Sequence, residues 1–294
     1  MTISSVKHPF TSAKADGPDA TLIQPGDWNA VHTLFEIPQP YVVGFNGENN
    51  AATPNTQFDL TSARVIVARD SSGNVYGKWN QGSLTCNLAT AGPAANARDT
   101  SGALGTTDFV HFYYIYNPTT DTWASTASAT APPTGPALPS GYTAWTYVCS
   151  VWNAVGPALR TVYVRGSWVY HRGEVAALSA GTATSTTAIT ITAIVPSIAL
   201  AYNLSGFHVV RSAADSATTT SNVRIEVVSG TTFASQDGSV NYPAAVRDHN
   251  SPLAFAGVPN VGQVLRYYSS VAGTGSTQGV TLNVTGYKVP NGDS

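Results

Sequence analysis

Four acidic side chains near the end of the chain could take part in the cleavage of glycosidic bonds. They are Asp215, Glu226, Asp237 and Asp248. Such cleavage needs two carboxyl groups that face one bond from opposite sides. The 16 acidic residues are spread thinly over 294 positions, and no spacing singles out a pair. We therefore expect these side chains to lie in turns and on surface strands, and we expect neither a catalytic residue nor an enzymatic activity.

Metal and cofactor chemistry has no motif in this sequence. The six histidines are His8, His32, His111, His171, His208 and His249, and none of them forms an HxH or HExxH pattern. Cys86 and Cys149 are far apart and belong to no CxxC pair, so we expect two buried free thiols. Glycine-rich nucleotide motifs are also absent. The sequence therefore predicts no metal site and no cofactor.

Aromatic residues of the C-terminal part offer the most plausible binding chemistry. Tyrosine rings stack on sugar rings, while hydroxyl, amide and carboxylate groups exchange hydrogen bonds with them. The candidates for binding a glycan or receptor are Tyr202, Tyr242, Asp248, His249, Asn250, Tyr267 and Tyr268. An alternative for Tyr267 and Tyr268 is a half-buried strand, because they follow Val264 and Leu265.

Composition excludes several classes of protein. Only 10% of the residues are charged and 43% are hydrophobic, which indicates a packed protein with a neutral surface. The net charge of -2 provides no basic field for nucleic acid. No apolar run reaches the roughly 18 residues of a membrane span, and Met1 to Phe10 do not resemble a signal peptide. We expect no nucleic-acid partner and no membrane insertion.

Short alternating runs from residue 41 onward predict an all-β fold. These runs include Ala63–Arg69, Phe109–Tyr116, Tyr142–Val151, Thr161–His171, Phe207–Arg211, Val223–Val228, Val264–Tyr268 and Val280–Val289. Four prolines between Ala131 and Gly141 predict a surface connector in place of a central strand. Asp27–Phe35 is the one candidate helix, since Asp27 could cap it.

We predict three parts. Residues 1–40 form an extended N-terminal arm with one short helix, 41–174 form an antiparallel β-sandwich module, and 175–294 form an outer, jelly-roll-like β-sandwich. The Thr- and Ala-rich stretch Leu178–Ile194 separates the two strand-rich regions.

Two stretches resemble tail and fibre proteins of bacteriophages and prophages. The first, KHPFTSAKADGPDATLIQPGDWNAVH, matches a recurring F-x-S-x-x-A-D-G-x-D-A-T-L-I-x-P-x-D-W-N-A-x-H segment. The second joins an aromatic strand ending in Asn117-Pro118 to the run Leu138-Pro139-Ser140-Gly141-Tyr142, with Phe112 in place of the usual Trp. Together they cover residues 8 to about 152, and the C-terminal half carries no such resemblance.

The resemblance implies a virion structural protein that is made in the host cytoplasm without a signal peptide. It implies that the arm attaches to other virion proteins through Phe10, Asp16, Asp19, Leu22, Pro25, Trp28 and His32. It also implies a homotrimeric tail fibre or receptor-binding protein whose C-terminal domain faces the host, and the aromatic residues named above make a surface glycan the candidate partner there. Two alternatives stay open: a capsid head fibre or decoration protein, and a tail-associated carbohydrate-degrading enzyme.

Overall fold

The structure is a computed structural model. It describes residues 5–6, 32–33, 40–154, 158–211, 218–228, 231–241, 248–272 and 277–292. All regular elements in these ranges are strands, which confirms the all-β prediction. Since this part contains no helix, it has none that is long and apolar enough to cross a membrane.

The predicted helix Asp27–Phe35 is wrong at its two described positions. His32–Thr33 form strand β2, which pairs antiparallel with β1, Ser5–Val6. Hydrogen bonds to a distant segment therefore replace the local bonds of a helix there. The other residues of the predicted helix lie outside the described ranges.

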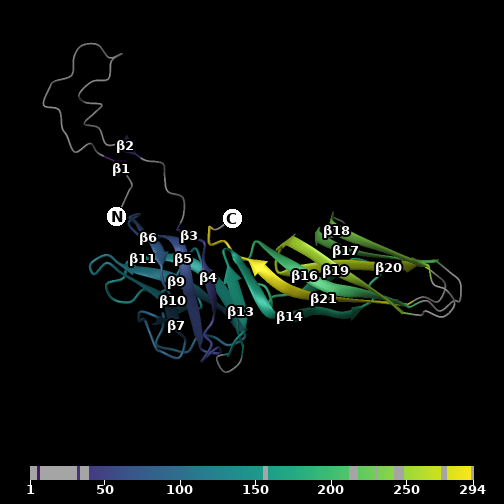
Figure 1. The fold of residues 1–294 in the computed structure, drawn as a ribbon, viewed down its shortest axis with the longest axis horizontal. Helices are drawn as coiled ribbons and strands as arrows, with labels where there is room; N and C mark the ends of the chain where they lie inside the picture. The colour runs from purple at the N-terminus through teal and green to yellow at the C-terminus, as the bar shows by residue number, and fades with distance from the viewer. Residues whose placement is uncertain are drawn as a thin grey trace, which may run out of the picture.

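Six strands close into a ring at one end of the molecule (Figure 1). In spatial order they are β5 Gln57–Asp70, β7 Leu84–Asn87, β8 Ala97–Arg98, β10 Thr122–Ser128, β9 Asp108–Asn117 and β11 Ala144–Ala154. The ring closes because Ala144 and Trp145 of β11 pair with the end of β5. The first module is thus a closed ring and not the predicted open sandwich, since closure satisfies the edge hydrogen bonds of both strands.

Three short strands border this ring. They are β3 Tyr41–Val43 and β6 Val75–Gln81, which both pair with β5, and β12 Ala158–Leu159, which pairs with β11. The proline-rich segment between Ala131 and Gly141 contains no strand, as predicted. It connects β10 to β11, with Gly135, Pro136 and Pro139 buried and Pro133, Thr134 and Ala137 exposed.

The sheet continues beyond β5 along the length of the molecule (Figure 1). Its further strands are β4 Asn46–Asn49, β13 Val162–Arg165, β14 Trp168–Gly181, β21 Thr277–Lys288, β16 Ala201–Arg211 and β19 Asp248–Pro259. β14 is 14 residues long and includes positions 174 and 175, with a register shift in its pairing with β21 between Tyr170 and Val175. One strand therefore spans the predicted boundary, and the division into domains stays a prediction.

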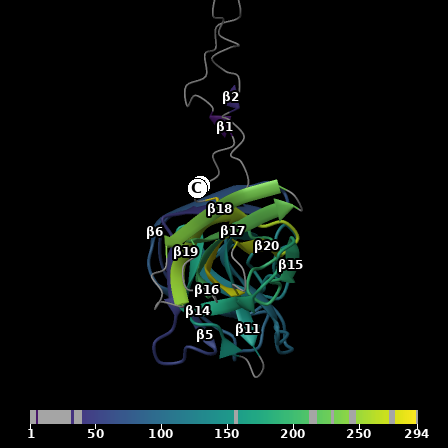
Figure 2. The same cartoon turned by 90° about the vertical axis from the view of Figure 1, so that its right-hand side faces the viewer.

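A separate four-stranded sheet lies at the end away from the ring (Figures 1 and 2). Its order is β15 Thr187–Thr190, β20 Val264–Ala272, β17 Thr218–Val228 and β18 Thr231–Asn241. The predicted separator Leu178–Ile194 thus contributes to two strands, because its first residues end β14 and its later ones form β15.

One hydrophobic core joins the ring to the far sheet. Inside the ring, Phe58 of β5 stacks on Phe112 of β9 with ring centroids 4.6 Å apart. Val284 of β21 and Ile225 of β17 belong to the same buried cluster. Cys86 and Cys149 are buried free thiols within it, as predicted. Burial raises the pKa of Cys86 to about 12, so this thiol stays protonated and unreactive at neutral pH.

The run Thr161–His171 is a hairpin and not the single strand predicted. β13 ends at Arg165 and β14 begins at Trp168, so only Gly166 and Ser167 form the turn. Gly166 has a φ of 58°, which a glycine adopts without strain in a tight hairpin turn. The Gly166 N–H donates to the Phe45 carbonyl at 2.8 Å, which ties the turn to the segment between β3 and β4.

Candidate ligand-binding surfaces

The residues predicted to anchor the arm fall almost wholly outside the described ranges. These are Phe10, Asp16, Asp19, Leu22, Pro25 and Trp28. His32 lies in β2, where its backbone faces Val6 of β1. The anchoring role of this set stays a prediction.

Two of the predicted glycan-binding tyrosines point into the core. Tyr202 of β16 is 1% exposed and Tyr267 of β20 is 3% exposed. Burial also raises the pKa of Tyr202 to about 12. Side chains alternate between the two faces of a strand, and these two occupy the inner face. Neither ring is therefore open to a ligand, and the alternative of a half-buried strand describes this region better.

The other predicted glycan-binding residues do not gather into one surface. Tyr268 is half-buried, and the Arg224 guanidinium lies 4.1 Å from the centre of its ring. Asn250 is exposed on β19, which belongs to the other sheet. Asp248 and His249 begin β19, where their backbones face Arg211 and Val210 of β16, and Tyr242 lies outside the described residues.

Glu226 is the only acidic candidate whose side chain belongs to the part of the chain that the structure describes. Glu226 is 2% exposed, and it accepts a hydrogen bond from the Thr186 hydroxyl at 2.9 Å. Asp215 lies outside the described residues, while Asp237 and Asp248 are placed by their backbones in β18 and β19. The same ranges hold no group of three or more His, Cys, Asp or Glu side chains that could bind a metal ion.

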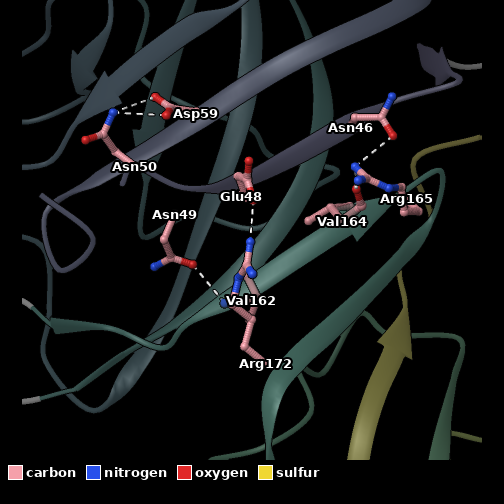
Figure 3. A network of polar contacts seen from close by, with 9 residues as sticks. All are labelled: Asn46, Glu48, Asn49, Asn50, Asp59, Val162, Val164, Arg165 and Arg172. Carbon is pink, nitrogen blue, oxygen red and sulfur yellow. Dashed lines mark hydrogen bonds and ion pairs between the residues drawn. The ribbon is translucent and has the colours of Figure 1, made fainter. Parts of the chain in front are cut away.

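A network of polar side chains covers the outer face of β4, β5, β13 and β14 (Figure 3). Glu48 forms an ion pair with Arg172, and both side chains are about half exposed. Beside it, the Asn50 amide donates to Asp59 at 3.0 Å, while Asn49 accepts from the Val162 N–H at 2.8 Å. These contacts join the neighbouring strands β4 and β5 to the β13–β14 hairpin, which lies more than 100 positions further along the chain.

Three aromatic rings form a stack next to this network. Tyr163 of β13 stacks on Tyr170 of β14 with centroids 5.0 Å apart, and Tyr170 stacks on Trp168 at 6.0 Å. Arg172 closes one end of the stack, since its guanidinium lies 5.9 Å from the Tyr163 ring. All three rings are partly exposed. We call Tyr163, Tyr170 and Trp168 the aromatic stack.

Sequence reasoning missed the aromatic stack, although the signal was present. The residues Tyr163, Arg165, Trp168 and Tyr170 alternate with Val162, Val164 and Val169, which are buried. Only a hairpin with a two-residue turn places the two runs opposite each other with their rings on one face. The Gly166-Ser167 dipeptide between the two runs is such a turn signal.

A cleft lies at the ring end, next to the start of the continuous described chain. It has a volume of about 640 Å³, and its wall includes Pro40, Trp145, Leu138, Arg69 and Asp70. An apolar wall with a few polar groups suits a small ligand or a peptide segment. Val42 lies close by and donates its N–H to the Asn291 carbonyl at 2.8 Å.

Comparisons with known proteins identify no family. No protein-family model matches this chain, and no curated protein matches its sequence. A structure of infectious bursal disease virus, Gx strain, is similar at a TM-score of 0.26 and 12% identity, over 86% of this chain and 78% of that one.

The tryptic core of a Bacillus thuringiensis Cry1Da variant is similar at a TM-score of 0.20 and 9% identity, over 85% of this chain. This chain spans about half of that protein, 52%. At such low TM-scores neither similarity carries an argument about function.

Proposed function

We propose that this chain is a structural component of a bacteriophage particle, namely a homotrimeric tail fibre or receptor-binding protein. It attaches through its N-terminus to other virion proteins and presents its C-terminal region to the host surface. The observation that carries this proposal is the resemblance of residues 8–32 and 109–142 to phage tail proteins.

The direction of the chain is consistent with this role. β3 begins at Tyr41, directly after the arm, and pairs with β5 of the ring. The four-stranded sheet lies at the opposite end of the long axis (Figure 1). An attachment at the arm therefore places that sheet away from the attachment point.

Removal of residues 1–35 is expected to abolish incorporation into particles while the β structure stays folded. The core of the described residues begins at Val42, so the deletion removes none of its members. Particles assembled with the truncated protein are purified and probed by immunoblot, and circular dichroism checks the strand content. Particles that retain normal amounts of the truncated protein would contradict the anchoring role.

Immunogold electron microscopy with antibody against residues 175–294 tests the position on the particle. Label at the tail tip is the expected result for a tail fibre. Label over the capsid would instead favour a head fibre or decoration protein, and an absence of label would contradict the virion assignment as a whole.

The trimer is supported by an exposed strand edge. β6 pairs with β5 and with no other described strand, and its Trp79 is 71% exposed. Unpaired edges and exposed large apolar side chains are typical of surfaces that another chain covers. Light scattering after gel filtration is expected to give three times the chain mass of 30.6 kDa. Trp79→Ser is expected to shift the protein toward monomer, whereas a wild-type protein that is monomeric at all concentrations would refute the trimer.

A further inference from the structure

A row of side chains on the outer face places an indole ring between two cations. Across neighbouring strands, Asn46 of β4 faces Arg165 of β13, Arg165 faces Trp168 of β14, and Trp168 faces Lys288 of β21. Directly opposed residues in antiparallel strands have Cβ atoms about 4.5–5.5 Å apart. Arg165 and Lys288 therefore flank Trp168 on both sides, on the face that carries the aromatic stack.

The Trp168 indole is held in place from one side by a ring of the aromatic stack. Tyr170 stacks against it, and the Tyr170 ring itself lies over Gly286 of β21. A Cβ at position 286 would lie 3.2 Å from Tyr170 Cδ1 and 2.6 Å from the Val169 carbonyl oxygen, so the glycine allows this close approach. The Asn291 amide donates to the Gly166 carbonyl at 3.0 Å and fixes the adjoining turn. Such a preformed platform loses little conformational entropy when a ligand binds.

The two cations beside the indole have no acidic partner among the described residues. Arg165 donates through Nη1 to Asn46 Oδ1 at 3.0 Å and to the Val164 carbonyl at 3.3 Å, which orients its guanidinium without neutralising it. The ion pair of this face joins Arg172 to Glu48 instead. The carboxylate of Glu174 accepts bonds from Ser205 and Asn283. The platform is therefore locally positive, although the whole chain has a net charge of -2.

We propose that Trp168, Arg165 and Lys288 bind an acidic sugar unit of a bacterial surface polysaccharide. The apolar C–H face of a pyranose ring stacks on the indole, and its carboxylate lies between the guanidinium and the ammonium group. Aromatic stacking explains why the ligand is a sugar, and the unneutralised cations explain why it is acidic. This inference deepens the proposed function, on which its biological setting rests, because it names the class of receptor.

Calorimetric titration of the full-length protein tests this site directly. The probes are tetragalacturonate as the acidic ligand and maltotetraose as the neutral one. We expect tetragalacturonate to bind more tightly and to lose affinity as salt rises, since salt screens the charges. Trp168→Ala is expected to weaken binding about tenfold or more, and Arg165→Gln and Lys288→Gln several-fold each, as lost stacking and charge-assisted hydrogen bonds would do.

Matched variants separate binding from folding. Phe233→Ala removes an exposed aromatic ring on β18 of the separate four-stranded sheet, away from this row, and is expected to leave binding unchanged. Lys288→Gln changes only a partly exposed side chain, so it keeps the test valid if Trp168→Ala fails to fold. Equal binding of both tetrasaccharides, or wild-type affinity in a folded Lys288→Gln and Trp168→Ala, would overturn the site.

The outcome of the sugar titration is independent of the assignment of this chain to a virion. Binding that fails in a protein shown by immunogold to lie at the tail would overturn this site alone. Binding that succeeds in a protein absent from particles would support the site and contradict the proposed function.

Discussion

Acidification from pH 7 to pH 4 is expected to lower the free energy of unfolding by several kcal/mol. The cause is a pair of buried histidines. Burial lowers the pKa of His111 to about 4 and that of His171 to about 3, against a normal value of 6.5. Their charge would be poorly solvated in the core, so both stay neutral while the protein is folded.

The sign of the effect follows from proton binding. Below pH 6.5 the unfolded chain takes up protons on these histidines, while the folded protein does not until pH 4 or lower. The unfolded state is therefore favoured as pH falls. The contribution of the neutral histidines to the free energy of unfolding is fully present above pH 6.5. It is lost progressively toward pH 4 for His111 and toward pH 3 for His171. At about 1.4 kcal/mol for each tenfold change in proton affinity, each histidine accounts for roughly 3–5 kcal/mol.

His171→Phe is the sharpest variant for this prediction. Neither ring nitrogen of His171 has a hydrogen-bond partner among the described residues, and its ring lies edge-on to Tyr287 with centroids 5.6 Å apart. A phenyl ring can therefore replace it with little change in stability at pH 7. At pH 4.5 we expect the variant to be more stable than the wild type by about 2–3 kcal/mol. Urea unfolding at both pH values measures this, and parallel pH profiles of the two proteins would exclude the role of His171.

Tyr287→Ala is expected to cost ~3–5 kcal/mol, because it removes a large, fully buried side chain and leaves a cavity. Tyr287 belongs to β21, but its hydroxyl donates to the Ser150 carbonyl of β11 at 2.7 Å. Its ring also contacts Phe109 of β9 edge-on, with centroids 6.1 Å apart. This residue therefore joins the extended part of the sheet to the ring.

Tyr287→Phe is the matched control and is expected to cost about 1 kcal/mol, since only the hydrogen bond is lost. In the wild type and in both variants, tryptophan fluorescence and far-UV circular dichroism are expected to report one unfolding transition. The physical reason is that β14 and Tyr287 couple both regions. Two separate transitions would instead favour independent modules divided near residue 175.

The sequence predicted where strands lie in the chain better than it predicted which strands pair with each other. Period-two alternation placed Phe109–Tyr116 inside β9 and Ala63–Arg69 inside β5. The prolines between Ala131 and Gly141 predicted a segment without strands, because proline cannot donate to a ladder. The alternation predicts one strand over Thr161–His171, because a Gly-Ser turn inside an alternating run changes the period very little.

The candidate binding residues show the limit of the same reasoning. Alternation predicts that half of the residues face the core, but the sequence alone does not say which half. Composition therefore predicts Tyr202 and Tyr267 as binding residues, whereas the fold places both in the core. Trp168 is not among the predicted binding residues, because the two cations that oppose it, Arg165 and Lys288, lie more than 120 positions apart in the sequence.

The amino-acid sequence by itself determined the all-β class, the free buried thiols and the strand-free proline connector. These properties depend on composition and on local backbone preferences, which the chain carries at each position. Only the tertiary structure decided the closure of the ring, the continuity of β14 across residue 175 and the grouping of Trp168 with Arg165 and Lys288. Strand pairing sets these features, because hydrogen bonds between distant segments fix the register that brings their side chains together.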